Sequence, residues 1–197
     1  MERPSCSRPE DPDLYKDDFF QKAAFSWVGK ECLLAIDHQG TCNCCWAFSG
    51  AEAITAAYAI KNKEVIPLSK QQLIDCTPNY YTVRSLKSVE KKTSACYTAH
   101  YNLVYEFAKD YGIVEESAYE YNEMRGDCVH PTARTVFIDG YEKVPSSTTK
   151  EGIEELIRKQ PITCAIPFVA SLQAHVGEGI YMGNSELSSL SYPKINY

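Results

Sequence analysis

Residues 39–50, QGTCNCCWAFSG, contain the side chains that acyl-transfer chemistry needs. Cys45 precedes Trp-Ala-Phe-Ser and a long apolar stretch, so we predict that it lies at a helix N-terminus, where exposed amides and the helix dipole favour a thiolate. Gln39 offers a side-chain amide that can join the Cys45 backbone N–H in donating to a developing oxyanion. The two residues therefore predict a nucleophilic thiol with an oxyanion-binding site.

Two other interpretations of this segment are weaker. A cysteine on an apolar helix is often a buried structural thiol, but Gln39 and the WAFS sequence favour a nucleophile at Cys45. Cys42, Cys44 and Cys45 could bind zinc, yet they lack paired C-x-x-C spacing and a second matching pair. We therefore predict no metal and no cofactor, and Cys44 has no predicted role.

The same segment resembles a known family, the papain-like cysteine peptidases. Their signature is C-G-[SA]-C-[WY], and this chain has C-N-C-C-W at 42–46. The resemblance extends from about Phe25 to Gly183, and the further segments that carry it are LSKQQLIDC at 68–76, the neighbourhoods of Cys96 and Cys128, QPITCAIP and GIYMG. It implies a cysteine-type peptidase that acts on peptide or protein substrates and is bound by cystatin-like inhibitors, with Cys45 and Gln39 in its active site.

The resemblance also implies the fold class, which is α+β. We expect a papain-like two-lobed fold with a helical first lobe and an incomplete antiparallel β second lobe. The predicted divisions are an N-terminal extension without fixed structure at 1–24, a helical lobe with the nucleophile helix at 25–128, and a partial β-barrel-like lobe at 129–197. Relative to the family, the chain is expected to be truncated.

The nine cysteines are an odd number, so at least one thiol is expected to stay out of a disulfide. The family pattern implies that Cys42 pairs with Cys96 and that Cys76 pairs with Cys128. The sequence separations are 54 residues (96 − 42) and 52 residues (128 − 76). Each bridge would stabilise the fold by about 4 kcal/mol in the chain-entropy model, provided that the compartment is oxidising.

The general base is the part of the predicted site that departs from the family. The family carries its histidine in H-x-V-x-x-V-G-Y-G and its asparagine in N-S-W-G, and this chain has neither. His175 lies 130 residues after Cys45 (175 − 45), which suits a papain-type histidine, but its context, SLQAHVGEGIYMG, resembles the family segment before the GIY strand.

The leading expectation is therefore a peptidase whose activity is lost or severely reduced. One alternative is a working endopeptidase that uses Cys45, Gln39 and His175. Another is a non-catalytic papain-fold module that binds peptides or an inhibitor.

Substrate-binding residues are expected around 95–101. Where the family has G-C-N-G-G, this chain has A-C-Y-T-A at 95–99, and the Tyr97 ring and Ala99 methyl group are expected to crowd a substrate backbone. The resemblance places Ala99, His100 and Tyr101 near the substrate.

Hydrophobic patterns and turn signals predict the elements that position these residues. Helices are predicted at 46–61, at 69–76 with a Ser69/Gln72 capping box, at 99–110 with Gly112 as a stop, and at 151–159 with a Thr148/Glu151 capping box. A polar insertion is predicted at 77–94. Strands are predicted at 133–145, 161–169 and 179–183.

The composition argues against some classes of binding partner, but it does not indicate the cellular compartment. The net charge of −6 has no long single-sign run, which argues against nucleic acid or an anionic membrane as partner, and no apolar run is long enough for a membrane span. The N-terminal residues lack the order of a signal peptide, so none is predicted. The family implies a vacuole, a lysosome or the extracellular space, and the localisation stays open.

Overall fold

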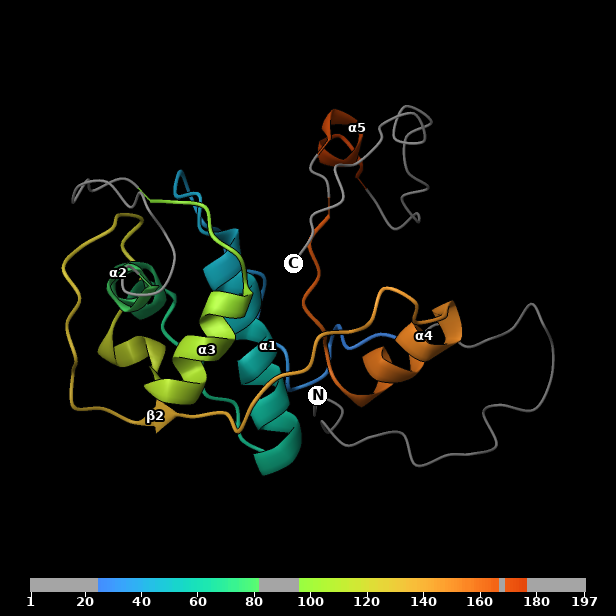
Figure 1. Ribbon diagram of the computed structural model, residues 1–197, viewed down its shortest axis with the longest axis horizontal. Helices are drawn as coiled ribbons and strands as arrows, with labels where there is room; N and C mark the ends of the chain where they lie inside the picture. The colour runs from blue at the N-terminus through green and yellow to red at the C-terminus, as the bar shows by residue number, and fades with distance from the viewer. Residues whose placement is uncertain (1–24, 82–95, 167–168, 177–197) are drawn as a thin grey trace. The chain divides into compact units, whose positions relative to one another are not determined.

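The structure is a computed structural model that describes residues 25–81, 96–166 and 169–176. The chain divides into two compact units, 1–163 and 164–197, which are treated separately. The first unit contains, in order, α1 (Cys45–Asn62), α2 (Lys70–Tyr81), α3 (Asn102–Asp110), β1 (Ile113–Val114), the 3₁₀ turn η2 (Glu116–Ala118), β2 (Thr135–Val136) and α4 (Lys150–Lys159). The second contains α5 (Ala170–Gln173) (Figure 1).

Helices α1, α2 and α3 pack against one another and enclose the main core (Figure 1). Helix α1 contributes buried residues on more than one side, as its dense apolar sequence predicts. At Gly50 an added Cβ would lie only 2.7 Å from three side-chain atoms of Val104. The glycine therefore lets α1 and α3 approach closely, and this contact fixes the helix that begins at Cys45.

The start of α1 places Cys45 where the sequence predicts it. Cys44 is the N-cap and Cys45 is the first helical residue. The helix ends at Asn62, and the C-cap residue Lys63 has a left-handed conformation in which its N–H donates to the Ala59 carbonyl at 2.9 Å. The predicted helix at 46–61 therefore agrees with the structure to within one residue at each end.

Helix α2 confirms half of its predicted capping box. The Ser69 hydroxyl accepts from the Gln72 N–H at 2.9 Å. The Gln72 side chain, however, accepts from the Val114 N–H at 2.9 Å and so ties α2 to β1 instead of closing the box. The helix also continues to Tyr81, so the predicted end at Cys76 was wrong, and the buried Thr77 shows that the polar insertion does not begin there.

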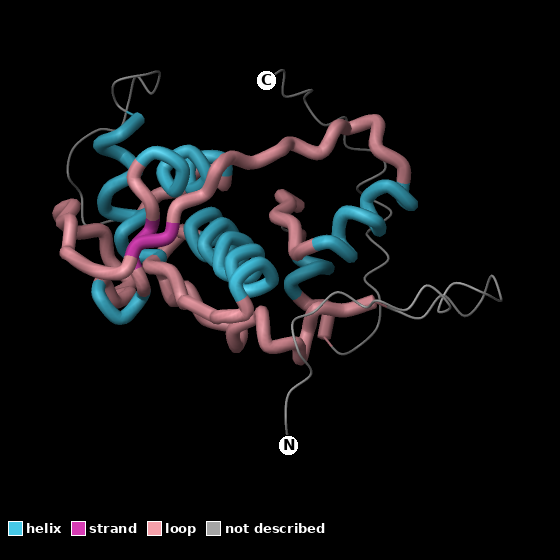
Figure 2. The backbone as a smooth tube through the Cα atoms, turned by 90° about the horizontal axis from the view of Figure 1, so that it is seen from below, coloured by secondary structure: helices cyan, strands magenta, loops and turns pink. Residues whose placement is uncertain are grey.

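The small antiparallel sheet pairs β1 with β2 in the register Ile113↔Val136 (Figure 2). Helix α3 begins at Asn102, three residues later than predicted (102 − 99), and Gly112 follows its end with a φ of +73° as the expected stop. Of the strand predicted at 133–145, only Thr135–Val136 forms. Its partner is the segment after α3, so this pairing belongs to the first unit.

Two predictions around α4 were wrong in detail. Thr149, and not Thr148, caps the helix, because Thr149 has extended backbone angles and its hydroxyl accepts from the Gly152 N–H at 3.2 Å. The strand predicted at 161–169 is not formed over residues 161–166. Helix α4 is anchored where the Trp27 indole N–H donates to the Ile157 carbonyl at 2.6 Å.

Both disulfides implied by the family pattern are present, Cys42–Cys96 and Cys76–Cys128. The first joins the segment before α1 to the segment before α3. Outside the disulfides, Cys32 and Cys44 are buried, whereas Cys45 and Cys164 are exposed.

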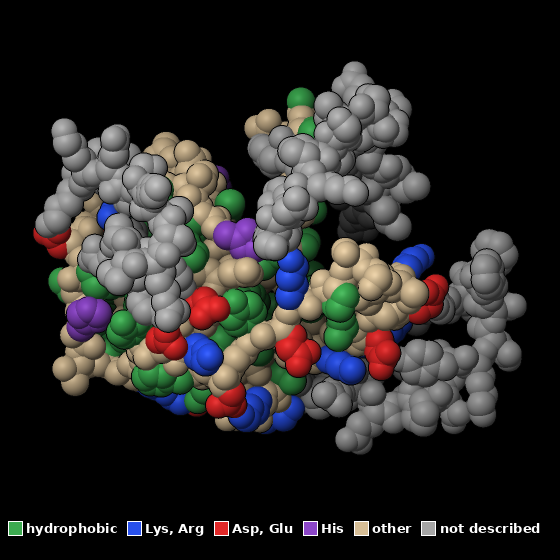
Figure 3. Space-filling view, in the orientation of Figure 1, with side chains coloured by type: hydrophobic (Ala, Val, Ile, Leu, Met, Phe, Trp, Pro, Cys, Tyr) green, Lys and Arg blue, Asp and Glu red, His purple; other side chains and the backbone are tan. Residues whose placement is uncertain are grey.

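Several sequence predictions lie outside the described residues: the extension at 1–24, the strand at 179–183 and the larger part of the insertion at 77–94. The domain boundary at 128/129 stays a prediction. Among the described helices, none combines the length and the apolar character that crossing a membrane requires. On the face shown in Figure 3, acidic and basic side chains of the described residues are interspersed.

Candidate active site

A cavity of about 490 Å³ brings Cys45 and Gln39 together. One wall is the chain segment 33–39, in which Leu33, Leu34 and Ile36 supply apolar surface. The other wall is the beginning of α1, from Cys45 to Glu52. The volume is in the range of small-ligand sites, and Cys45 is exposed at a helix N-terminus within it. This arrangement is the one expected of a thiol nucleophile, and it indicates the class of cysteine-dependent acyl-transfer enzymes.

Gln39 is held in this cavity by its backbone. Its carbonyl oxygen accepts from the Cys42 N–H at 3.2 Å and from the Tyr121 hydroxyl at 2.7 Å. The side-chain Oε1 is buried and has no hydrogen-bond partner within the described part of the chain. Leaving a buried polar atom unpaired costs about 1–3 kcal/mol, which the two hydrogen bonds to the Gln39 carbonyl offset in part.

Tyr121 and Cys44 form a second layer behind Gln39 that the sequence did not predict. The Tyr121 hydroxyl lies 3.3 Å from the Cys44 sulfur while it donates to Gln39. Burial raises the pKa of Tyr121, and the hydrogen bond with Cys44 raises it further, so the phenol stays protonated as a donor. Burial also raises the pKa of Cys44, although the bond to Tyr121 opposes this effect. Cys44 therefore stays a neutral thiol beside the Tyr121 hydroxyl.

We expect Tyr121→Phe to weaken the hold on Gln39. The change removes one of two hydrogen bonds to the Gln39 carbonyl, so the free energy of unfolding should fall by about 1 kcal/mol. Labelling of Cys45 by a peptide-like electrophile, which uses the oxyanion donors, should slow more than labelling by iodoacetamide, which does not. Equal slowing of both reactions would show that Tyr121 supports the fold only.

A buried lysine ties the two walls of the cavity together. The Lys70 ammonium lies 3.3 Å from Asp37, 3.4 Å from Glu52 and 3.9 Å from Glu116, with only 4% of its side chain exposed. Asp37 belongs to the segment 33–39 and Glu52 to α1. A buried cation is tolerated only when it is paired, so this cluster fixes the spacing of the walls.

The Lys70 cluster predicts a pH dependence of stability. Burial raises the pKa of Glu52 and Glu116 above the ordinary value of 4.5, although Lys70 opposes this effect. A carboxyl whose pKa is raised by folding stabilises the fold below its ordinary pKa, and this contribution is lost as the pH rises through the folded-state pKa. We therefore compare the free energies of unfolding of the natural chain and of Glu52→Gln. The advantage of the natural chain should decrease as the pH rises above 4.5. Urea titrations at several pH values measure this difference.

Ala99, His100 and Tyr101 are not among the residues that line the cavity. His100 is exposed, with its ring 4.2 Å from the Tyr101 ring, and Ala99 packs against the main core. The expectation that the Tyr97 ring crowds the substrate was wrong, because its hydroxyl donates to the Ile74 carbonyl at 3.0 Å and the ring contacts Trp46. His175 is an exposed residue of the second unit, just after α5.

His38 is the one histidine among the described residues that line the cavity. It is exposed, and its Nδ1 accepts from the Gly40 N–H at 2.9 Å. In a neutral imidazole with Nδ1 as acceptor, the proton is on Nε2. The lone pair that would take a proton from the Cys45 thiol is therefore already occupied.

Comparison with known proteins agrees with this class. The model of the papain family cysteine proteases matches residues 22–192. The cysteine proteinase COT44 of Brassica napus is 32% identical over 160 residues, covering 80% of this chain and 45% of that protein. The germination-specific cysteine protease 1 of Arabidopsis thaliana is 31% identical over 161 residues, covering 80% of this chain and 39% of that protein.

Solved structures show the same fold. A structure from work on the mite allergens Blo t 1 and Der p 1 has a TM-score of 0.55 at 28% identity, covering 64% of this chain and 39% of that one. The Carica candamarcensis cysteine protease CMS1MS2, in complex with E-64, has a TM-score of 0.54 at 21% identity, covering 66% and 55%, and supports the fold alone.

The chain belongs to the papain family of cysteine proteases. The predicted family and the predicted α+β, papain-like fold class are both confirmed. The chain spans less than half the length of the two plant relatives.

Proposed function

We propose that this chain is a cysteine peptidase by descent that keeps the nucleophile and the oxyanion site but cleaves peptide bonds poorly or not at all. Cys45 is the nucleophile, and the Gln39 side chain with the Cys45 N–H forms the oxyanion site. The observation that carries the proposal is the shared cavity: an exposed thiol at the start of α1 faces the same space as a backbone-anchored glutamine.

The expectation of impaired turnover rests on His38, the one histidine among the described residues that line the cavity. Its Nδ1 already accepts the Gly40 N–H. Without a base, a thiol loses the partner that takes its proton on attack and returns it to the leaving amine. Loss of a triad member lowers turnover by roughly 10⁴-fold or more. Peptide substrates are then bound and attacked slowly.

Two experiments on the full chain test this proposal. A peptidyl epoxide of the E-64 type should label the protein once, at Cys45, whereas hydrolysis of a fluorogenic peptide ester should stay near background. Rapid hydrolysis that Cys45→Ala abolishes would overturn the claim of impairment. Absence of labelling at Cys45 would overturn the assignment of the nucleophile.

The alternatives are separated by the same assays. For a working endopeptidase that uses His175, hydrolysis would be rapid and would be lost in His175→Ala. For a module that only binds, Cys45→Ala would still bind a cystatin-like inhibitor or a peptide while the natural chain shows no hydrolysis.

A further inference from the structure

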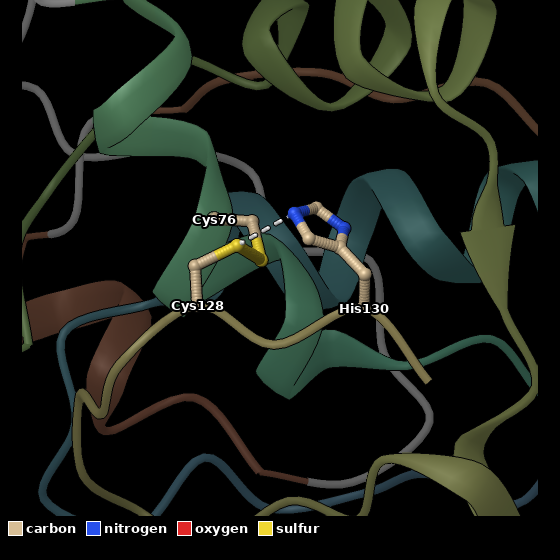
Figure 4. A group of neighbouring side chains, drawn as sticks. All are labelled: Cys76, Cys128 and His130. Carbon is tan, nitrogen blue, oxygen red and sulfur yellow. Dashed lines mark hydrogen bonds between the residues drawn. A yellow bond between two sulfur atoms is a disulfide. The ribbon is translucent and has the colours of Figure 1, made fainter. Parts of the chain in front are cut away.

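Cys76, Cys128 and His130 form a compact group on the first unit, apart from the Cys45 cavity lining (Figure 4). Cys76 is buried in α2. Cys128 is half-buried in the loop between η2 and β2, and His130 is exposed two residues later in the same loop. Figure 4 shows the imidazole directed toward the two sulfur atoms. Its Nε2 lies 3.5 Å from the Cys128 sulfur, and the three ligand atoms all lie within 4.8 Å of one another.

Two separations decide whether this group can hold a tetrahedral Zn²⁺ ion. With Zn–S bonds of about 2.3 Å and a Zn–N bond of about 2.0 Å, the ion separates a sulfur from a nitrogen ligand by roughly 3.5 Å and two sulfurs by roughly 3.8 Å. The first separation is already present between Cys128 and His130. The second requires that the Cys76–Cys128 bond be cut, because a disulfide sulfur is not a thiolate ligand.

The loop that carries two of the ligands is held to α2 without the disulfide. Asp75, next to Cys76, accepts from the Gly126 N–H at 2.6 Å and from the Tyr119 hydroxyl at 2.7 Å. The Gln71 side chain donates to the Met124 carbonyl at 2.6 Å. Since these bonds do not depend on the sulfur–sulfur bond, Cys128 and His130 should remain beside Cys76 after reduction. Reduction should therefore leave the three side chains near one another.

We propose that Cys76, Cys128 and His130 bind Zn²⁺ when the Cys76–Cys128 disulfide is reduced. A phosphine reductant takes the disulfide and one water to two thiols and a phosphine oxide, and the incoming Zn²⁺ displaces the two thiol protons. Water fills the fourth position, which the exposed His130 leaves accessible. The ion replaces the covalent link between α2 and the loop, so the cross-link persists in a reducing compartment. This departs from the sequence expectation of no metal site, and it is independent of the proposed peptidase function.

Metal uptake by the full chain tests the proposal. After reduction with a phosphine, Co²⁺ alone should give thiolate charge-transfer and four-coordinate visible bands, and Zn²⁺ should abolish them. Zn²⁺ should also raise the thermal midpoint of the reduced protein and leave that of the oxidised protein unchanged. His130→Ala keeps the disulfide, so its fold can be verified in the oxidised state. It should weaken Zn²⁺ binding by roughly tenfold or more.

The other thiols provide a matched control. The double variant Cys42→Ser with Cys96→Ser removes the same number of thiols at the other bridge and should keep both the cobalt spectrum and the effect of His130→Ala. The proposal is overturned if the reduced chain takes up no Zn²⁺, if His130→Ala binds as tightly as the natural chain, or if the Cys42/Cys96 variant alone abolishes the site.

Discussion

Cys45→Ala is expected to abolish covalent labelling by a peptidyl epoxide, together with any hydrolysis that remains above background. The thiol at this position is exposed at the first residue of α1 and faces the cavity that contains Gln39. No other group on the described cavity lining is a thiol. The measurement is the rate of adduct formation by intact-mass spectrometry, followed by peptide mapping of the modified residue.

Cys164→Ser is the matched control for this experiment. Cys164 is also exposed and outside the disulfides, but it belongs to the second unit. The epoxide reaction should therefore be unchanged in Cys164→Ser, whereas a small reagent such as iodoacetamide should lose one site of modification in each variant. An epoxide adduct that persists in Cys45→Ala would place the reactive thiol elsewhere in the chain.

Phe107→Ala is expected to lower the free energy of unfolding by about 3–5 kcal/mol, the usual cost of emptying a buried aromatic site. Only 2% of the Phe107 side chain is exposed, and it lies in α3 within the core that α1 and α2 enclose. Equilibrium unfolding in urea measures the loss under oxidising conditions, so that both disulfides stay formed in all variants.

Phe137→Ala makes the same chemical change at a side chain that is 60% exposed. It should cost roughly 0.5 kcal/mol or less, because most of that ring already faces solvent. Similar losses in both variants would contradict the placement of the core between the three helices. If the larger loss at Phe107 is accompanied by slower labelling of Cys45, the three-helix packing is what positions the nucleophile.

Short-range signals in the sequence were sufficient for the parts of this protein that depend on neighbouring residues. Cys45 at a helix start, Ser69 as a cap and Gly112 as a stop are set by backbone groups within one helical turn, and the structure has all three. The N-cap of α4 was predicted at the wrong residue, because two adjacent threonines offer the same side chain. Thr149 replaces Thr148 as the cap, since it is the residue directly before the first helical residue, Lys150.

The structure alone decided which residues meet across long sequence separations. Tyr121 reaches Gln39 from 82 residues away, and the Gln72 side chain bonds to Val114 42 residues away instead of to its own helix start. Neither contact has a local sequence signature, because one depends on how the segment after η2 meets the chain before α1 and the other on how α2 meets β1.

The Lys70 cluster and the group of Cys76, Cys128 and His130 also bring together residues that are far apart in the sequence. Lys70 gathers acidic partners from three separate segments, and His130 meets a disulfide whose pairing the family resemblance implied without indicating that a histidine lies beside it. The sequence by itself therefore indicated the family, and it placed the proposed nucleophile and its proposed oxyanion partner in one continuous segment. Tertiary structure decided what holds that segment in place and what surrounds each sulfur, because burial and long-range pairing exist only once the helices have packed.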